Sequence, residues 1–252
     1  MTSIGITPKY EKEAEKFYVE VLELFKKTDF QFLMGGTYAV KHYTGIDRPT
    51  KDLDIFCKAG DYPKILKFFS DQKYNVGVED DRWLARIYKD EFFVDIIFGS
   101  IPGMWPITDE WMEKAQKGKI LGFDVKITPP EELIVSKAYR MKRSEFDGAD
   151  VTHIILKCAD SLDWKHLLNR LEPNWELLFI HVILFRFTYP SERDIIPRWL
   201  IDELLSRVHA QLDIPSPKDK VTRGSMLSQH QYRIAIEKWG YKDITEFTFP
   251  QK

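Results

Sequence analysis

The spacing of hydrophobic and polar residues changes along the chain, and this change predicts where helices and strands form. Over residues 11–27 the apolar side chains Ala14, Phe17, Val21 and Leu24 return every three or four positions, which is typical of an amphipathic helix. Short apolar or alternating runs bounded by turn-forming residues predict strands and hairpins. These runs cover residues 30–34, 53–57, 83–88, 92–98 and 119–127.

Helical spacing dominates the second half of the chain. Helices are expected there over residues 162–171, 175–187, 191–212 and 228–240, and in the first half over residues 37–43, 62–73 and 109–116. Two further helices are expected to start at Thr128, whose hydroxyl can cap, and at Asp147, where Asp147 and Asp150 fit a capping role. The pattern therefore predicts an α/β (α+β) chain, with a small mixed sheet in residues 1–128 and a mostly helical part in residues 129–252.

Composition supports a folded protein and argues against one class of partner. The chain has 252 residues, of which 44% are hydrophobic and 14% aromatic, enough to bury a core. It carries 37 Lys and Arg against 39 Asp and Glu, a net charge of −2. Such a balance disfavours a protein that coats nucleic acid by bulk electrostatics, although it leaves room for a local basic groove.

The cysteines and the apolar runs point to a cytoplasmic protein without a membrane span. Cys57 and Cys158 are far apart and form no metal-like pair, so neither a disulfide framework nor a zinc module is expected. The start of the chain, Met1 to Ile4, leads into charged residues without the apolar region of a signal peptide. The longest apolar stretch, Leu177 to Phe185, is too short to span a bilayer.

Three carboxylates occupy positions where charge is costly. Asp52 and Asp54 are two apart on a predicted strand, so both project from one face. Asp95 lies within a predicted strand that is otherwise apolar. If these strands are neighbours, the three carboxylates converge and suit a hard divalent cation, above all Mg²⁺. The alternative is that each acid sits at a strand edge or pairs with a nearby base. The candidate bases are Arg82, Arg86 and Lys51.

A glycine turn lies upstream of the acid pair. Gly35 and Gly36 follow a predicted strand and precede a predicted helix that starts at Thr37. Backbone amides of such a turn can approach a phosphate, and the helix adds its positive end. Taken alone this is weak evidence, because turns use glycine everywhere. Together with an acid pair on the next strand it forms a specific combination.

These residues resemble the signature of the polymerase-β-type nucleotidyltransferase superfamily. That signature is a Gly-Gly or Gly-Ser turn, an Asp-x-Asp on the following strand, and a third acid on a later strand. The sequence runs Leu33-Met34-Gly35-Gly36-Thr37 and then Arg48-Pro49-Thr50-Lys51-Asp52-Leu53-Asp54-Ile55, and Asp95 matches the third acid.

A later stretch resembles one branch of that superfamily. Starting at Pro130-Glu131-Glu132-Leu133, it continues through Lys137, Arg143, Asp147 and Asp150, a Lys…Arg…Asp…Asp pattern. This pattern is similar to that of the bacterial abortive-infection (AbiEii-like) toxins and their uncharacterised relatives. The resemblance covers roughly residues 30–150, and its first part is much more specific than its second.

The resemblance implies a transfer of a nucleoside monophosphate from an NTP to a hydroxyl, with release of pyrophosphate. Asp52, Asp54 and Asp95 would hold two Mg²⁺ ions, with Asp95 also helping to activate the acceptor hydroxyl. The groups expected to grip phosphates, or to offset charge on the leaving pyrophosphate, are Gly35, Gly36, Thr37, Arg48 and Lys51.

Lys137 and the acceptor are left with open alternatives. The ammonium of Lys137 would reach a phosphate as a point charge, or would belong to a solvated basic face with Arg140, Lys142 and Arg143. The candidate acceptors are a tRNA 3′ end, a protein hydroxyl and a small molecule. The resemblance to the toxin branch also implies a toxin–antitoxin partner protein. The alternatives to transfer are a catalytically silent nucleotide-binding regulatory protein of the same fold and a phosphohydrolase using the same metals.

Overall fold

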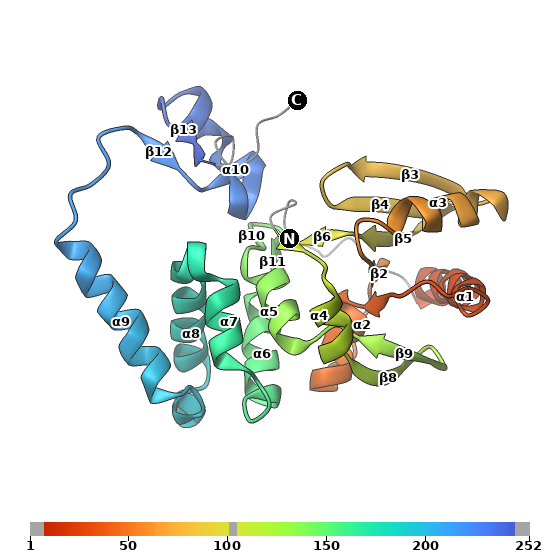
Figure 1. Cartoon of the computed structure of the whole chain (residues 1–252), viewed down its shortest axis with the longest axis horizontal. Helices are drawn as coiled ribbons and strands as arrows, with labels where there is room; N and C mark the ends of the chain where they lie inside the picture. Colours follow the sequence, from red (N-terminus) through yellow and green to blue (C-terminus); the bar gives the residue numbers. More distant parts are fainter. Residues whose placement is uncertain (1–7, 101–104, 245–252) are drawn as a thin grey trace. The chain divides into compact units, whose positions relative to one another are not determined.

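The protein consists of two compact units, Met1–Leu133 and Ile134–Lys252 (Figure 1). The structure is a computed structural model that describes residues 8–100 and 105–244. The sequence predicts the division after residue 128, close to the end of the first unit. Because the two units are separate bodies, each is described by itself.

A seven-stranded mixed sheet forms the frame of the first unit within the described residues. Its strands, in spatial order, are β3 (Asn75–Asp80), β4 (Leu84–Lys89), β5 (Phe92–Ile97), β2 (Asp52–Phe56), β1 (Leu33–Met34), β9 (Phe123–Ile127) and β8 (Gln116–Ile120). β2 runs parallel to β5 and β1 runs parallel to β9, while the other neighbours are antiparallel. The predicted mixed α/β class is therefore confirmed.

The hairpins predicted from alternation are present, but one strand of the seven-stranded sheet has no counterpart among the predicted elements. β4 with β5 and β8 with β9 form the expected antiparallel pairs. β3 is the unexpected strand, because Asn75, Gly77, Glu79 and Asp80 are poor strand formers. It lies at the edge of the sheet, where Val78 is 48% exposed, so pairing with β4 rather than side-chain burial defines it.

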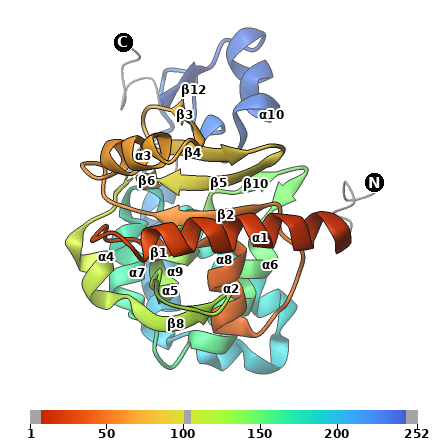
Figure 2. The same ribbon diagram turned by 90° about the vertical axis from the view of Figure 1, so that its right-hand side faces the viewer.

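Helices pack on the sheet and on one another in the first unit. These helices are α1 (Pro8–Phe25), α2 (Gly36–Thr44), α3 (Tyr62–Asp71) and α4 (Asp109–Lys114). Figure 2 shows α1 in front of the sheet, running alongside β2. The ring of Phe25 on α1 lies 5.1 Å from that of Phe69 on α3, and the ring of Phe17 lies 6.0 Å from that of Tyr74. Aromatic contacts therefore join α1 to α3 and to the segment that leads into β3.

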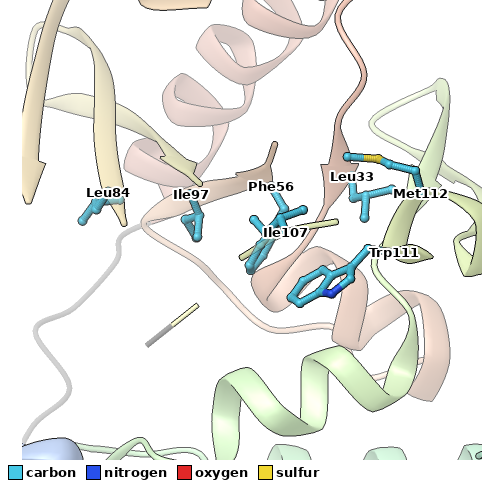
Figure 3. Packing of buried hydrophobic residues seen from close by; sticks show 7 residues of the cluster. All are labelled: Leu33, Phe56, Leu84, Ile97, Ile107, Trp111 and Met112. Atoms are coloured by element: carbon cyan, nitrogen blue, oxygen red, sulfur yellow. The ribbon is translucent and has the colours of Figure 1, made fainter. Parts of the chain in front are cut away.

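A compact apolar cluster supports the end of β2. Its members come from β1, β2, β4, β5 and the segment around α4, and they are Leu33, Phe56, Leu84, Ile97, Ile107, Trp111 and Met112 (Figure 3). The ring of Phe56 lies 5.9 Å from that of Trp111. Burying each such side chain contributes about 1.5–3 kcal/mol. The cluster thus fixes the strand that carries Asp52 and Asp54.

The second unit is mostly helical, as predicted. Its helices are the end of α5 (Pro130–Ala138), α6 (Gly148–Cys158), α7 (Trp164–Arg170), α8 (Trp175–Thr188), α9 (Arg198–Leu212) and α10 (Ser225–Glu237), with short 3₁₀ turns at Glu172–Asn174 and Pro190–Ile195. The second unit also has two short strand pairs, β10 (Met141–Lys142) with β11 (Glu145–Phe146) and β12 (Val221–Thr222) with β13 (Lys242–Asp243). A similar pair in the first unit joins β6 (Gly99–Ser100) to β7 (Trp105–Pro106). Across residues 8–100 and 105–244, no helix is long and apolar enough to cross a bilayer. The prediction about Met1 to Ile4 lies outside the described residues.

The single helix predicted over residues 191–212 is wrong. The chain instead forms the 3₁₀ turn Pro190–Ile195 and then α9, with Pro197 between them. A residue before proline is pushed out of the helical region, and Ile196 accordingly has φ −71° and ψ 123°. Proline therefore divides what the apolar spacing alone presents as one helix.

The predicted helix caps have mixed outcomes. The hydroxyl of Thr128 has no hydrogen-bond partner, and Asp147 at the start of α6 makes no side-chain cap hydrogen bond, so both capping predictions are wrong. Ser228 does start a helical segment as predicted. Its φ of −165° and ψ of 103° interrupt α10, and its hydroxyl accepts a hydrogen bond of 3.3 Å from the amide of Gln231.

A buried histidine links two helices of the second unit. His181 on α8 is 1% exposed, and its Nε2 donates to the carbonyl oxygen of Ala138 at the end of α5 over 3.0 Å. Its Nδ1 has no hydrogen-bond partner. Burial therefore lowers the pKa of His181 below its usual 6.5, although the bond to Ala138 opposes that shift.

Acidification is expected to destabilise the second unit through His181. Below pH 6.5 the unfolded chain binds a proton at this residue before the folded chain does, so the free energy of unfolding falls as pH falls from 6.5 towards the folded pKa. We expect His181→Gln, whose amide can still donate to Ala138, to weaken this dependence in urea unfolding measured between pH 5 and pH 8. The exposed His209→Gln serves as the control. Identical pH dependence in wild type and His181→Gln would contradict the assignment.

Candidate active site on the mixed sheet

Three carboxylates converge where β2 and β5 lie side by side. Successive side chains of a strand alternate between its two faces, so Asp52 and Asp54 share one face of β2. Leu53 and Ile55 are fully buried on the other face. In the parallel pairing of the two strands, Asp54 stands opposite Asp95. One oxygen atom of each acid lies within 4.8 Å of those of the other two. The predicted convergence of the three acids is confirmed, and the set is called the acid cluster below.

Each end of the acid cluster has its own hydrogen-bond donor. The hydroxyl of Thr50 donates to Oδ1 of Asp52 over 2.8 Å. On the other side, Nε of Arg86 donates to Oδ1 of Asp95 over 2.7 Å. Asp95 is 8% exposed, so this ion pair is shielded from water. Pairing with a nearby base, the alternative considered from the sequence, is therefore correct for Asp95.

The other two candidate bases are placed differently. Arg82 pairs with Asp80 at the edge of the sheet, with Nη2 2.6 Å from Oδ2 of that carboxylate. Lys51 is exposed at the entrance to β2. Of the three candidate bases, Arg86 is therefore the one that the structure pairs with an acid of the cluster.

The sequence presents Arg86 only as a candidate neutralising partner, but the structure gives it a defined position. Its guanidinium carbon lies 4.2 Å from the centre of the Phe93 ring. Burial lowers its pKa, but the hydrogen bond to Asp95 and the charge of that acid outweigh burial and raise the pKa of Arg86 above its usual value. Counting back from the hairpin turn would have given the register, since Lys89 opposite Phe92 places Arg86 opposite Asp95.

The glycine turn is shaped by close packing against β2. A Cβ on Gly35 would lie 2.0 Å from the ring of Phe56, and a Cβ on Gly36 would lie 1.6 Å from Oδ2 of Asp54. Gly36 also has a φ of +52°, which L side chains rarely adopt. These two glycines therefore allow the start of α2 to approach the carboxylate of Asp54 directly.

The start of α2 offers backbone amides to an anion, but the Gly35 amide is already engaged. It donates to the carbonyl oxygen of Asp54 over 2.9 Å, as part of the contact between β1 and β2. The first amides of a helix have no partner in a preceding turn, and at the start of α2 these belong to Gly36 and Thr37. Phosphate binding by these groups remains a prediction.

The loop between α2 and β2 carries the two predicted cationic side chains. Arg48 and Lys51 are both exposed there. The loop starts at Gly45, which has a φ of +74°, and Lys41 pairs with Asp47 over 2.8 Å. The structure thus places both cations just ahead of Asp52 along the chain, and their contact with a nucleotide remains a prediction.

Lys137 is a buried member of an ion-pair network in the second unit. It is 5% exposed, and its Nζ lies 2.9 Å from Oδ2 of Asp147 and 2.8 Å from Oδ2 of Asp150. The interpretation as a solvated basic side chain is therefore wrong for Lys137. The network also explains why Asp147 does not cap α6, since its carboxylate faces the ammonium instead. A phosphate contact of Lys137 remains a prediction.

Comparison with protein families gives one match that covers more than half of the chain. The family is described as nucleotidyl transferase of unknown function (DUF2204), and the match covers residues 14–174 of 252. Comparison with curated proteins gives no match.

Solved structures provide distant likenesses. The lincosamide antibiotic adenylyltransferase LnuA with bound lincomycin is 17% identical with a TM-score of 0.41, over 59% of this chain and 96% of that one. The antibiotic-resistance factor ANT(2'')-Ia is 13% identical with a TM-score of 0.47, over 80% and 99%. JHP933 from Helicobacter pylori is 16% identical with a TM-score of 0.40, over 92% and 99%.

Gly36→Ala is expected to disturb the acid cluster, since the new Cβ would collide with Asp54. Gly45→Ala is a matched control, because Gly45 ends the same helix at a φ of +74° and has open space around its Cβ position. Both variants carry the backbone cost of about 1–3 kcal/mol. We expect Mg²⁺ to raise the melting temperature of the wild type and of Gly45→Ala, but not that of Gly36→Ala. The same Mg²⁺ response in both variants would show that Asp54 keeps its position.

Proposed function

The chain belongs to the family of nucleotidyl transferases that matches it, and we propose that it moves a nucleoside monophosphate from an NTP to an acceptor hydroxyl, releasing pyrophosphate. The observation that carries this proposal is the acid cluster, with oxygen atoms of Asp52, Asp54 and Asp95 within 4.8 Å of one another. Three carboxylates this close repel one another strongly, and a divalent cation would relieve that repulsion.

The donor set fits a hard cation. All three acids offer carboxylate oxygens, which are the ligands that Mg²⁺ prefers in proteins. Asp52 and Asp54 would hold one ion beside the triphosphate, and Asp95 would complete the site of a second ion. When bound, Mg²⁺ supplies positive charge that stabilises the attacking and leaving oxygens.

The start of α2 is the proposed phosphate-binding element. The amide of Gly36 and the amide and hydroxyl of Thr37 are the groups we assign to the terminal phosphates, at the positive end of a nine-residue helix. Gly35 contributes by packing rather than by its amide, which already bonds to Asp54. Arg48 and Lys51 are assigned to the departing pyrophosphate, whose negative charge grows as the bond breaks.

Asp95 is proposed to act on the acceptor hydroxyl. A carboxylate beside the attacking oxygen can accept its proton as the new P–O bond forms. Lys137 keeps a proposed part in phosphate binding. Its ion pairs with Asp147 and Asp150 would then either persist beside the phosphate or break when the phosphate binds.

The acceptor, the partner and the compartment complete the proposal. The acceptor hydroxyl is that of a tRNA 3′ end, a protein or a small molecule, and the net charge of −2 disfavours a long nucleic acid held by bulk electrostatics. The resemblance to the AbiEii-like branch adds an antitoxin as a partner protein. Cys57 and Cys158 are buried, and the described residues hold no disulfide between them, which supports a reducing, cytoplasmic setting.

The central test detects nucleotide binding as a rise in the melting temperature of the protein. Each of the four NTPs is added with and without Mg²⁺ to wild type, to Asp54→Asn and to Asp124→Asn, a control that removes one exposed charge from the same sheet. At about 100 times its dissociation constant a ligand stabilises the fold by about 2.7 kcal/mol, or roughly 5–10 °C here. We expect a Mg²⁺-dependent shift with at least one NTP in wild type and the control, and none in Asp54→Asn. Equal shifts in all three proteins would place the nucleotide elsewhere.

Arg48→Ala is expected to weaken NTP binding while leaving the fold intact. The side chain is exposed, so its loss removes a charge near the proposed pyrophosphate position without opening a cavity. We expect the dissociation constant of the NTP, measured by calorimetry with Mg²⁺, to rise by roughly threefold to tenfold. Lys67→Ala, which removes an exposed cation on α3, is the control. An unchanged dissociation constant would remove Arg48 from the site.

A further inference from the structure

We propose that Arg86 is a positioning residue that fixes the carboxylate of Asp95 for cation binding. This inference rests on the proposed function, because it concerns the acid that completes the second cation site. In this role Arg86 lies at the edge of the acid cluster and neither binds the cation nor touches the substrate.

The geometry of the hairpin directs Arg86 at one atom of Asp95. The two residues are opposite each other on β4 and β5, and directly opposed side chains of an antiparallel pair lie on the same face. Nε of Arg86 donates to Oδ1 over 2.7 Å. Rotation of the carboxylate about its Cβ–Cγ bond would break this hydrogen bond, so the bond selects one orientation.

The guanidinium of Arg86 is itself held in place. On one side it lies over the ring of Phe93, 4.2 Å from the ring centre. Its Nη1 also lies 3.8 Å from Oε2 of Glu79 on β3. The side chain is 27% exposed, so much of it is enclosed by these neighbours. A planar group with fixed neighbours loses little further freedom when it binds a carboxylate.

Positioning and simple charge neutralisation predict opposite effects on the affinity for a cation. If Arg86 only neutralises charge, its removal makes the acid cluster more negative and strengthens cation binding. If Arg86 positions Asp95, its removal loosens one ligand and weakens binding, as the loss of groups that orient metal ligands typically does. Substitution by lysine keeps the charge but loses the planar Nε donor, so it separates the two roles further.

The experiment is a titration with Mn²⁺ alone, followed by the loss of the free-ion signal in electron paramagnetic resonance. The proteins are the full-length wild type, Arg86→Met, Arg86→Lys and Arg82→Met. Arg82→Met is the matched control, since it removes another Arg–Asp ion pair from the same sheet without contact to Asp95. We expect Arg86→Met to weaken Mn²⁺ binding roughly tenfold or more, Arg86→Lys to weaken it less, and the control to match wild type.

Several outcomes overturn the inference. Equal or tighter Mn²⁺ binding by Arg86→Met would leave Arg86 as a neutralising charge, and an equal loss in Arg82→Met would trace the effect to the stability of the sheet. Should Arg86→Met fail to fold, Arg86→Lys decides, because wild-type affinity in that variant contradicts positioning. Asp54→Asn, titrated in parallel, tests the premise separately. If it binds Mn²⁺ as wild type does, the acid cluster is not the cation site and the proposed function fails.

Discussion

Mutual repulsion among three carboxylates is the constraint on which the local structure of the first unit depends. Oxygens of Asp52, Asp54 and Asp95 lie within 4.8 Å of one another on two parallel strands. Each acid lies against a group that tempers its charge. Thr50 donates to Asp52, the start of α2 reaches Asp54 across a glycine, and Arg86 donates to Asp95. The surrounding chain is therefore arranged to hold charges together that would otherwise separate.

The same strand that carries two of these acids also anchors them. Phe56 follows Asp54 by two residues, so it shares the face of the acids, and its ring enters the apolar cluster of β1, β4, β5 and α4 (Figure 3). Gly35 is needed for the same reason, because a side chain there would collide with that ring. Burial of Phe56 at one end of β2 thus offsets the electrostatic cost of the carboxylates at the other end. The acid cluster and the apolar cluster that supports it therefore depend on neighbouring positions of one short strand.

Local patterns in the sequence predict the strands that carry the three acids, but the prediction could only assume that β2 and β5 are neighbours, since their pairing is not local. Alternation fixes the face of Asp52 and Asp54, and the hairpin of β4 and β5 follows from two runs of strand-forming residues around a short turn. The predictions fail where a distant partner or a single residue decides. Lys137, ten positions away, takes the carboxylate of Asp147 that was expected to cap α6. Pro197 divides an apparent helix, and β3 exists through pairing at a sheet edge. Residue types alone leave Arg86 as one of three candidate bases, and only the register of the hairpin singles it out.

Anomalous diffraction from crystals of the protein grown with Mn²⁺ and a non-hydrolysable NTP tests the central claim most directly. We expect a manganese peak within coordination distance of Asp52 and Asp54, with Asp95 completing a second site and the phosphates at the start of α2. Manganese bound elsewhere, with the contacts of Thr50 to Asp52 and of Arg86 to Asp95 unchanged, would contradict it.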